Sequence, residues 1–212
     1  MRLLMTKAEL ATPGGPQAVG SALFSSTMPE PASEILQTLA RPAMQLLVQL
    51  FTSASTAGTA ATAVTHRIWL RDGAAVLGQA TGDGGAELSM ADPVLVPYAV
   101  AQLVGLRRRP PPLGRKPIQV PLATYRAVEA GEAQMPELAA VLRSRRLSWR
   151  VSSAVPSGST RPVVKWLHVT DAGPAGLWRI TVDHSDHGQS GVALTPMRAR
   201  EVWWALHKEV FS

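Results

Sequence analysis

The chain contains no cysteine among its 212 residues. Disulfide bridges and cysteine-based zinc sites are therefore excluded, and this composition fits a cytoplasmic protein. Charged residues make up only 17% of the chain and aromatic residues 5%, whereas hydrophobic residues make up 46%. This balance excludes an intrinsically disordered chain and predicts a globular protein that buries a hydrophobic core.

Long hydrophobic runs are also absent. The longest apolar stretch, Met44–Phe51, is interrupted by Gln45 and Gln49 and is too short to span a bilayer. The opening letters MRLLMTKAEL contain neither a sustained apolar run nor a small-residue cleavage site, so no secretory signal is predicted. We expect a soluble protein without membrane insertion.

The sequence lacks the common catalytic motifs. There is no G-x-S-x-G nucleophile motif and no phosphate-binding loop, and the glycines at 82–85 precede a strand pattern, whereas a dinucleotide fingerprint precedes a helix. Acidic residues are sparse and unpaired, which argues against hydrolysis by two carboxylates. We therefore expect no enzyme activity, no catalytic residue and no cofactor.

The segment Asp183–His187 (DHSDH) is the one candidate for chemistry. Its imidazoles and carboxylates are metal ligands, which would suit a metal site. However, the segment joins two strand patterns, and Asp, Ser and Gly are residues that stabilise turns. We favour a hairpin loop and expect no metal.

The net charge of +6 is concentrated in one region. Residues 107–150 contain ten Lys or Arg and three Glu, with clusters at Arg107–Arg109 and at Arg143, Arg145 and Arg146. The first cluster lies in a proline-rich segment and the second at the end of a predicted helix, where cations are favourable. We interpret this charge as a solvated face, and the alternative is a nucleic-acid-binding module that uses the Arg107–Arg150 stripe.

Two stretches of the chain carry the same pattern. His66–Leu106 and Val164–Phe211 each contain three short runs of alternating apolar and polar residues, followed by an apolar helical pattern. A constant shift of 106 residues aligns their ends, pairing Leu88 with Leu194, Val96 with Val202, Tyr98 with Trp204, Val100 with Leu206 and Val104 with Val210. This predicts a duplicated strand-strand-strand-helix unit.

The remaining segments suggest how the chain is divided. Residues 1–33 are predicted to be largely irregular, 34–106 to form a first lobe, 107–117 a Pro/Arg-rich linker and 118–212 a second lobe. Within them we expect further elements: a helix from an N-capping Ser33 to about Ala40, apolar residues resuming after Pro42 through Leu50, a low-complexity loop over Thr52–Thr65, an extended IQVPL segment, helices over 124–130 and 136–146, and a strand in SWRVSSA.

The closing helical pattern has apolar residues on both sides. Val202, Leu206 and Val210 form one stripe with Trp203 beside it, whereas Trp204 and Phe211 are predicted to point the opposite way. The second side either packs against another helix of the chain or contacts a partner, for which Trp and Tyr supply large contact areas.

These features together resemble the EspG family, the cytosolic secretion-associated proteins of type VII (ESX) systems in mycobacteria and their relatives. The resemblance covers about residues 34–212 and rests on the two related α/β halves, the joint PPPLGRKPIQVP and the closing GVALTPMRAREVWWALHKEV. It implies an α+β fold of two pseudo-twofold-related lobes, with antiparallel sheet in the middle and helices outside. It also implies a chaperone that binds a PE–PPE heterodimer through the PPE subunit, shields its apolar tip and needs no cofactor.

For the contact surface we predict Trp166, Trp178 and Trp204, a choice that rests on expected exposure alone. The segment before residue 34 is shorter and richer in Gly and Pro than in the family, so we expect a first lobe that lacks its early elements. Such a lobe would expose a sheet edge and permit a homodimer. A self-associating structural protein is the main alternative function.

Overall fold

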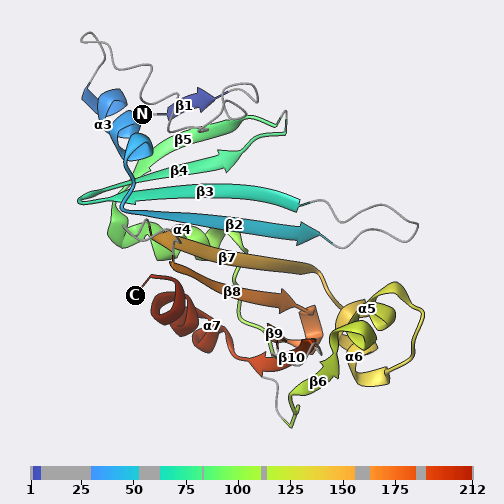
Figure 1. Cartoon of the computed structure of the whole chain (residues 1–212). Coiled ribbons are helices and arrows are strands. Elements are labelled where there is room, and N and C mark those ends of the chain that lie inside the picture. Colours follow the sequence, from blue (N-terminus) through green and yellow to red (C-terminus); the bar gives the residue numbers. More distant parts are fainter. Residues whose placement is uncertain are drawn as a thin grey trace. The chain divides into compact units, whose positions relative to one another are not determined.

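The computed structural model describes residues 2–5, 30–52, 63–82, 84–110, 114–155, 163–184 and 190–211. The fold is α+β with antiparallel strand pairing (Figure 1), as predicted. The chain forms two compact units, and each is described here by itself. Unit 1 consists of Met1–Gln49, Val64–Leu103 and Val151–Lys165, and unit 2 of Leu50–Ala63, Val104–Arg150 and Trp166–Ser212. The predicted lobe boundaries, 34–106 and 118–212, stay a prediction.

The elements of the first part of the chain are β1 (Arg2–Met5), α3 (Glu30–Ala40), β2 (Met44–Thr52), β3 (Ala63–Arg71), β4 (Ala74–Ala80), β5 (Ala86–Ala91), the 3-10 turn η1 (Pro93–Leu95) and α4 (Val96–Leu103). Within unit 1 the strand order is β1-β5-β4-β3-β2. The three predicted strands and the helical pattern that follows them are confirmed. The turn between β4 and β5 closes with the Thr81 amide donating to the Gly85 carbonyl, as turn chemistry predicts.

The core of unit 1 lies between α3 and one face of the sheet. Ile35, Leu36 and Leu39 of the helix pack against Trp69, Val76 and Leu88 of β3, β4 and β5. Gly78 makes room for the Trp69 ring, because a Cβ atom at this position would lie 2.8 Å from a ring carbon. The buried stripe of α3 therefore fixes the helix on the sheet.

The elements of the second part are β6 (Ile118–Pro121), α5 (Leu122–Ala130), α6 (Pro136–Arg143), β7 (Leu147–Val155), β8 (Val163–Asp171), the 3-10 turn η2 (Gly173–Ala175), β9 (Leu177–His184), β10 (Ser190–Met197), α7 (Ala199–Ala205) and a closing π-helical turn, η3 (Leu206–Val210). The strands of this second part are ordered β7-β8-β9-β10-β6, although β7 after Arg150 and β8 before Trp166 are assigned to unit 1. The extended IQVPL segment, the two short helices and the SWRVSSA strand are thus confirmed, with ends shifted by a few residues. α5 and α6 lie next to each other (Figure 1) and cover a core that includes Ile180, Val192 and Leu194.

Several local predictions need correction. Ser33 is not the N-cap, because the helix begins at Glu30 and Ser33 lies inside it, where its hydroxyl accepts a hydrogen bond from Gln37. Residues Arg2–Met5 are not irregular but form β1, which pairs with β5. The stretch Met44–Thr52, which sequence reasoning left without an element, is the strand β2. Residues 6–29 and 53–62 lie outside the described residues, so the predictions for them stay open.

The first lobe was expected to lack its early elements, but β1, at the start of the chain, is part of the sheet. β1 lies along the outer edge of β5 with Leu3 opposite Leu88, and β6 lies along β10 with Ile118 opposite Leu194. Leu88 and Leu194 are equivalent under the shift of 106 residues. Each unit therefore has an extra strand at the same position, and β1 covers the edge of β5. The homodimer expected from an exposed sheet edge stays a prediction.

Within the described ranges, no helix is long and apolar enough to span a bilayer.

Candidate interaction surface

One face of the strands β7 and β8 in unit 2 carries a polar cluster. The Ser148 Oγ atom lies 2.9 Å from His168 Nε2 and 2.9 Å from Thr170 Oγ1. Side chains alternate across a strand, so Arg150 shares the face of Ser148, and Trp166 shares the face of His168 and Thr170. Sequence reasoning missed this cluster, although the alternation in SWRVSS and VKWLHVT places these residues on one face.

The imidazole of His168 is held neutral at this position. Burial, together with the positive charges of Arg150 and Arg145, lowers the pKa of His168 to about 4. The ring also lies beside Phe51, with 6.2 Å between the ring centroids. Because the imidazole is neutral and hydrogen-bonds to the Ser148 hydroxyl group, it places no charge on this half-buried surface.

Trp166 gives this face its exposed aromatic side chain. Its exposed fraction is 39%, whereas its neighbour Leu167, which points to the opposite face of β8, is fully buried. Arg150 is exposed on the same face. Trp and Arg are the residue types most enriched at the centres of protein–protein interfaces, so this face has the composition of an interaction surface.

The closing helix of unit 2 exposes a second tryptophan. Val202, Leu206 and Val210 are fully buried, which confirms the predicted stripe, while Trp204 is 69% exposed. Trp203 packs edge-on against His207, with ring centroids 4.8 Å apart. The helical turn is held to β9 by a bidentate ion pair in which Arg179 donates to both Glu209 carboxylate oxygens at 2.7 Å.

Two predictions about aromatic residues are wrong. Phe211 does not share the side of Trp204, because its ring lies 6.1 Å from the ring of His207 on the Trp203 side. Trp178, predicted as a contact residue, is only 2% exposed and belongs to the core beneath α5 and α6. Its indole N–H donates to the Ala175 carbonyl at 2.9 Å, which fixes the ring in place. Of the three predicted contact residues, the structure exposes Trp166 and Trp204.

Unit 1 has an exposed apolar patch of its own. Val94, Leu95 and Tyr98, at the start of the α4 region, are 81%, 56% and 64% exposed. Tyr98 is the position equivalent to Trp204, and the buried residues Val96 and Val100 are equivalent to Val202 and Leu206. The pairing by 106 residues therefore predicts both which side chains are buried and which aromatic side chain is exposed.

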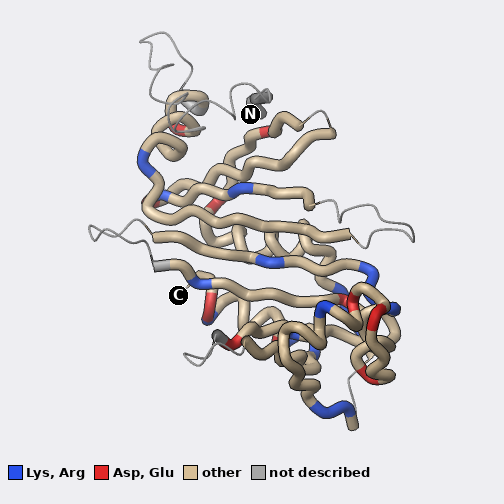
Figure 2. Tube along the Cα trace, turned by 45° about the vertical axis from the view of Figure 1, so that its right-hand side comes forward, with Lys and Arg blue, Asp and Glu red and all other residues tan. Residues whose placement is uncertain are grey.

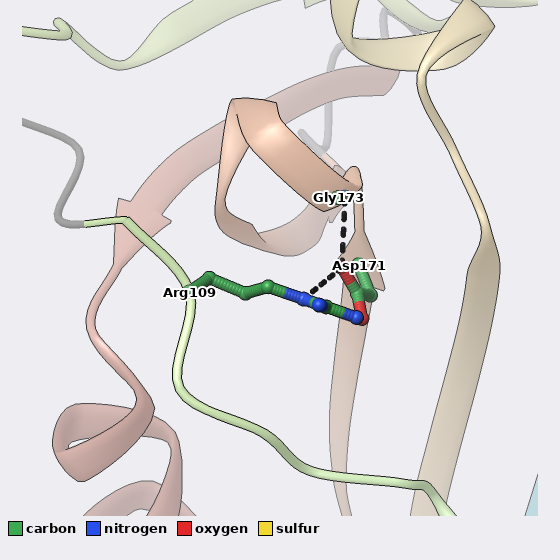
Figure 3. Close-up of polar contacts among 3 residues, drawn as sticks. All are labelled: Arg109, Asp171 and Gly173. Atoms are coloured by element: carbon green, nitrogen blue, oxygen red, sulfur yellow. Dashed lines mark hydrogen bonds and ion pairs between the residues drawn. The ribbon is translucent and has the colours of Figure 1, made fainter.

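The arginine clusters are only partly a solvated face. Arg109 forms a bidentate pair with the largely buried carboxylate of Asp171, which also accepts the Gly173 amide at 2.8 Å (Figure 3). Arg145 pairs with Glu129 at 2.6 Å. The solvated interpretation is wrong for these two arginines, whereas Arg107, Arg108, Arg143 and Arg146 are exposed. Figure 2 shows acidic and basic residues mixed around α5 and α6, so the stripe is not continuously basic.

In the part of the chain that the structure describes, no group of three or more His, Cys, Asp or Glu side chains is placed to hold a metal ion. Asp183 and His184 are the last residues of β9, which pairs with β10 as a hairpin with Ser190 opposite His184. The rest of the segment, 185–187, lies outside the described residues.

Neither a protein-family model nor a curated protein matches this chain.

Proposed function

We propose that the chain is a cytoplasmic chaperone or adaptor for a type VII (ESX) secretion system. In this proposal it binds a PE–PPE heterodimer through the PPE subunit, shields the apolar tip of that subunit and keeps the pair soluble for export. The resemblance to the EspG family supplies the class of partner. The observation that carries the proposal is the exposure of large apolar side chains among the described residues, above all Trp204 and Trp166.

The two units further support an EspG-like architecture. Each has an added edge strand, four strands in sequence order and a closing helix, and buried residues recur at equivalent positions. We propose that they are the two pseudo-twofold-related lobes of such a fold. An adaptor without a catalytic step needs apolar contact area and a polar rim, because these give affinity and register without bond chemistry.

Unit 2 provides the better contact surface in this proposal. Trp166 supplies apolar area, and Arg150 supplies a guanidinium group that can bind a carboxylate or carbonyl of the partner. Ser148 is only 4% exposed, and its hydroxyl lies within hydrogen-bond distance of Thr170 as well as of His168. These contacts favour a structural role for the Ser148–His168 pair, which holds the floor of the surface, over the role of a nucleophile and its base.

The proposal is tested by capture of a PE–PPE pair encoded beside this chain. Trp166→Ala and Trp204→Ala are each expected to weaken capture by about tenfold or more, the loss typical of a central interface residue. Val155→Ala is the matched control, because Val155 is also 39% exposed but points away from the Arg150 face of β7. Wild-type capture by both tryptophan variants would show that the contact surface lies elsewhere.

A further inference from the structure

We propose that a cavity in unit 2 binds a small ligand that combines a carboxylate with an apolar body. The cavity has a volume of about 650 Å³, within the range of small-molecule sites, and opens between the segment Gly114–Pro117, the helix α6 and the turn η2. Sequence reasoning interpreted this segment only as a linker. The apolar wall comes from Ile118, Val141 and Trp178.

The cavity is built from groups that hold each other in place. The Ala175 carbonyl accepts hydrogen bonds from both the Trp178 indole and the Arg115 guanidinium, and the Arg115 guanidinium carbon lies 5.9 Å from the centre of the Trp178 ring. Asp171 anchors η2, the turn that carries Ala175, because its carboxylate accepts hydrogen bonds from Arg109 and from the Gly173 amide (Figure 3). A site whose polar group is already positioned loses less entropy when a ligand binds.

The charges around the cavity select an anion. The lining includes Arg115 and Lys116 and one acidic residue, Glu137, so these three side chains give it a net charge of +1. A guanidinium has five N–H donors, and the hydrogen bond to Ala175 uses one of them. The remaining donors suit a carboxylate, which binds Arg in a bidentate manner, while the apolar wall suits an aliphatic or aromatic body.

Two sources of this chemistry are distinguished by two probes. Isothermal titration of the full chain with 4-phenylbutyrate tests a free carboxylic acid, and titration with N-acetyl-Ala-Ala-Phe tests the carboxyl terminus of a peptide. The amide of each probe is the control. We expect saturable binding of at least one acid and about tenfold weaker binding of its amide, because the charge-assisted hydrogen bonds are lost. Binding of the peptide acid alone supports the site and assigns its ligand to a chain terminus.

Variants locate the binding in this cavity. Arg115→Gln is expected to weaken binding by about tenfold, Lys116→Gln by less, and Ala140→Phe to abolish binding by filling the cavity. If thermal unfolding shows that Arg115→Gln is not folded, Arg115→Lys is the second variant. It keeps the charge but loses the bidentate hydrogen-bond geometry, so it should also weaken binding. The proposal is overturned if neither acid binds saturably at millimolar concentration, if acid and amide bind equally, or if the folded Arg115 variants bind as wild type. Trp166 and Trp204 do not line this cavity, so its failure would leave the proposed function untouched.

Discussion

The two units follow the same order of strands and closing helix, yet they differ in what surrounds equivalent positions. Tyr98 in unit 1 and Trp204 in unit 2 are both largely exposed. Around Tyr98 the exposed neighbours are Val94 and Leu95, whereas the equivalent residues beside Trp204 are Arg200 and Glu201. The buried pattern is thus shared, while the surface pattern differs in charge.

A second difference lies between the edge strand and the following strands. Unit 1 has the helix α3 among its described residues there, whereas unit 2 has α5 and α6, and a cavity opens between α6 and the segment Gly114–Pro117 that precedes β6. The buried residues therefore preserve the repeat, whereas the units differ in their exposed and inserted segments. Function is therefore to be sought in the features that the units do not share.

The largest expected effect tests the shared core. Leu88→Ala and Leu194→Ala remove equivalent side chains that are 1% and 0% exposed, so each should lower the free energy of unfolding by about 3 kcal/mol. Denaturant unfolding followed by circular dichroism measures both. A loss at one position with no loss at the other would show that the two residues are not equivalent in packing.

The turn after the first strand of each repeat should separate the units. Asp171→Ala breaks the bidentate pair with Arg109, whose side chain is only 20% exposed, at an expected cost of about 2 kcal/mol. Asp72, in the turn after β3, is exposed, and Asp72→Ala should change stability by less than about 0.5 kcal/mol. Equal costs for the two variants in thermal unfolding would mean that the Arg109 pair does not stabilise unit 2.

Each unit also buries one histidine whose pKa is lowered, and this predicts a dependence on pH. Burial lowers the pKa of His66 in unit 1, where Nδ1 accepts the Ala80 amide at 3.1 Å, and it lowers the pKa of His168 in unit 2 to about 4. The unfolded chain, with an ordinary pKa near 6.5, then binds more protons than the folded chain below that pH. Stability should be complete above about pH 6.5 and fall as the pH falls from there.

For His168 the loss should reach about 3 kcal/mol near pH 4, the folded-state value, and level off below it. Urea unfolding between pH 7.5 and 4 measures the slope. His168→Asn should reduce the loss of unfolding free energy on acidification and leave only the part due to His66. The variant therefore separates the contribution of unit 2 from that of unit 1. Stability that rises as the solution is acidified would contradict the buried neutral imidazoles.

Substitutions of the two equivalent exposed aromatic residues should change stability little but test the function directly. Tyr98→Ala and Trp204→Ala each change an exposed side chain and should alter the free energy of unfolding by less than about 1 kcal/mol. If unit 2 contacts the partner, Trp204→Ala should weaken capture of a PE–PPE pair while Tyr98→Ala leaves it unchanged. The reverse result in a pull-down would assign the contact to the unit 1 patch.

Sequence patterns predicted most of the strands because alternation is a local signal, and the shift of 106 residues repeats that signal in a second stretch of the chain. The strand β2 was not predicted because MQLLVQLFT has apolar residues on both faces. The strand β1 was not predicted because four residues are too few to show a period. The exposure of Trp178 was misjudged because alternation identifies a face but does not reveal which face helices cover. The Arg109–Asp171 pair joins residues 62 positions apart, and no local pattern reports such a contact.

The most direct test of the central proposal is the mass of the species formed when this chain is co-expressed with a PE–PPE pair encoded beside it, measured by size-exclusion chromatography with light scattering. We expect a stoichiometric soluble complex, with the pair insoluble when expressed without this chain. A chain that elutes alone or as a homodimer, beside a pair that is soluble without it, would contradict the chaperone proposal and favour a self-associating protein.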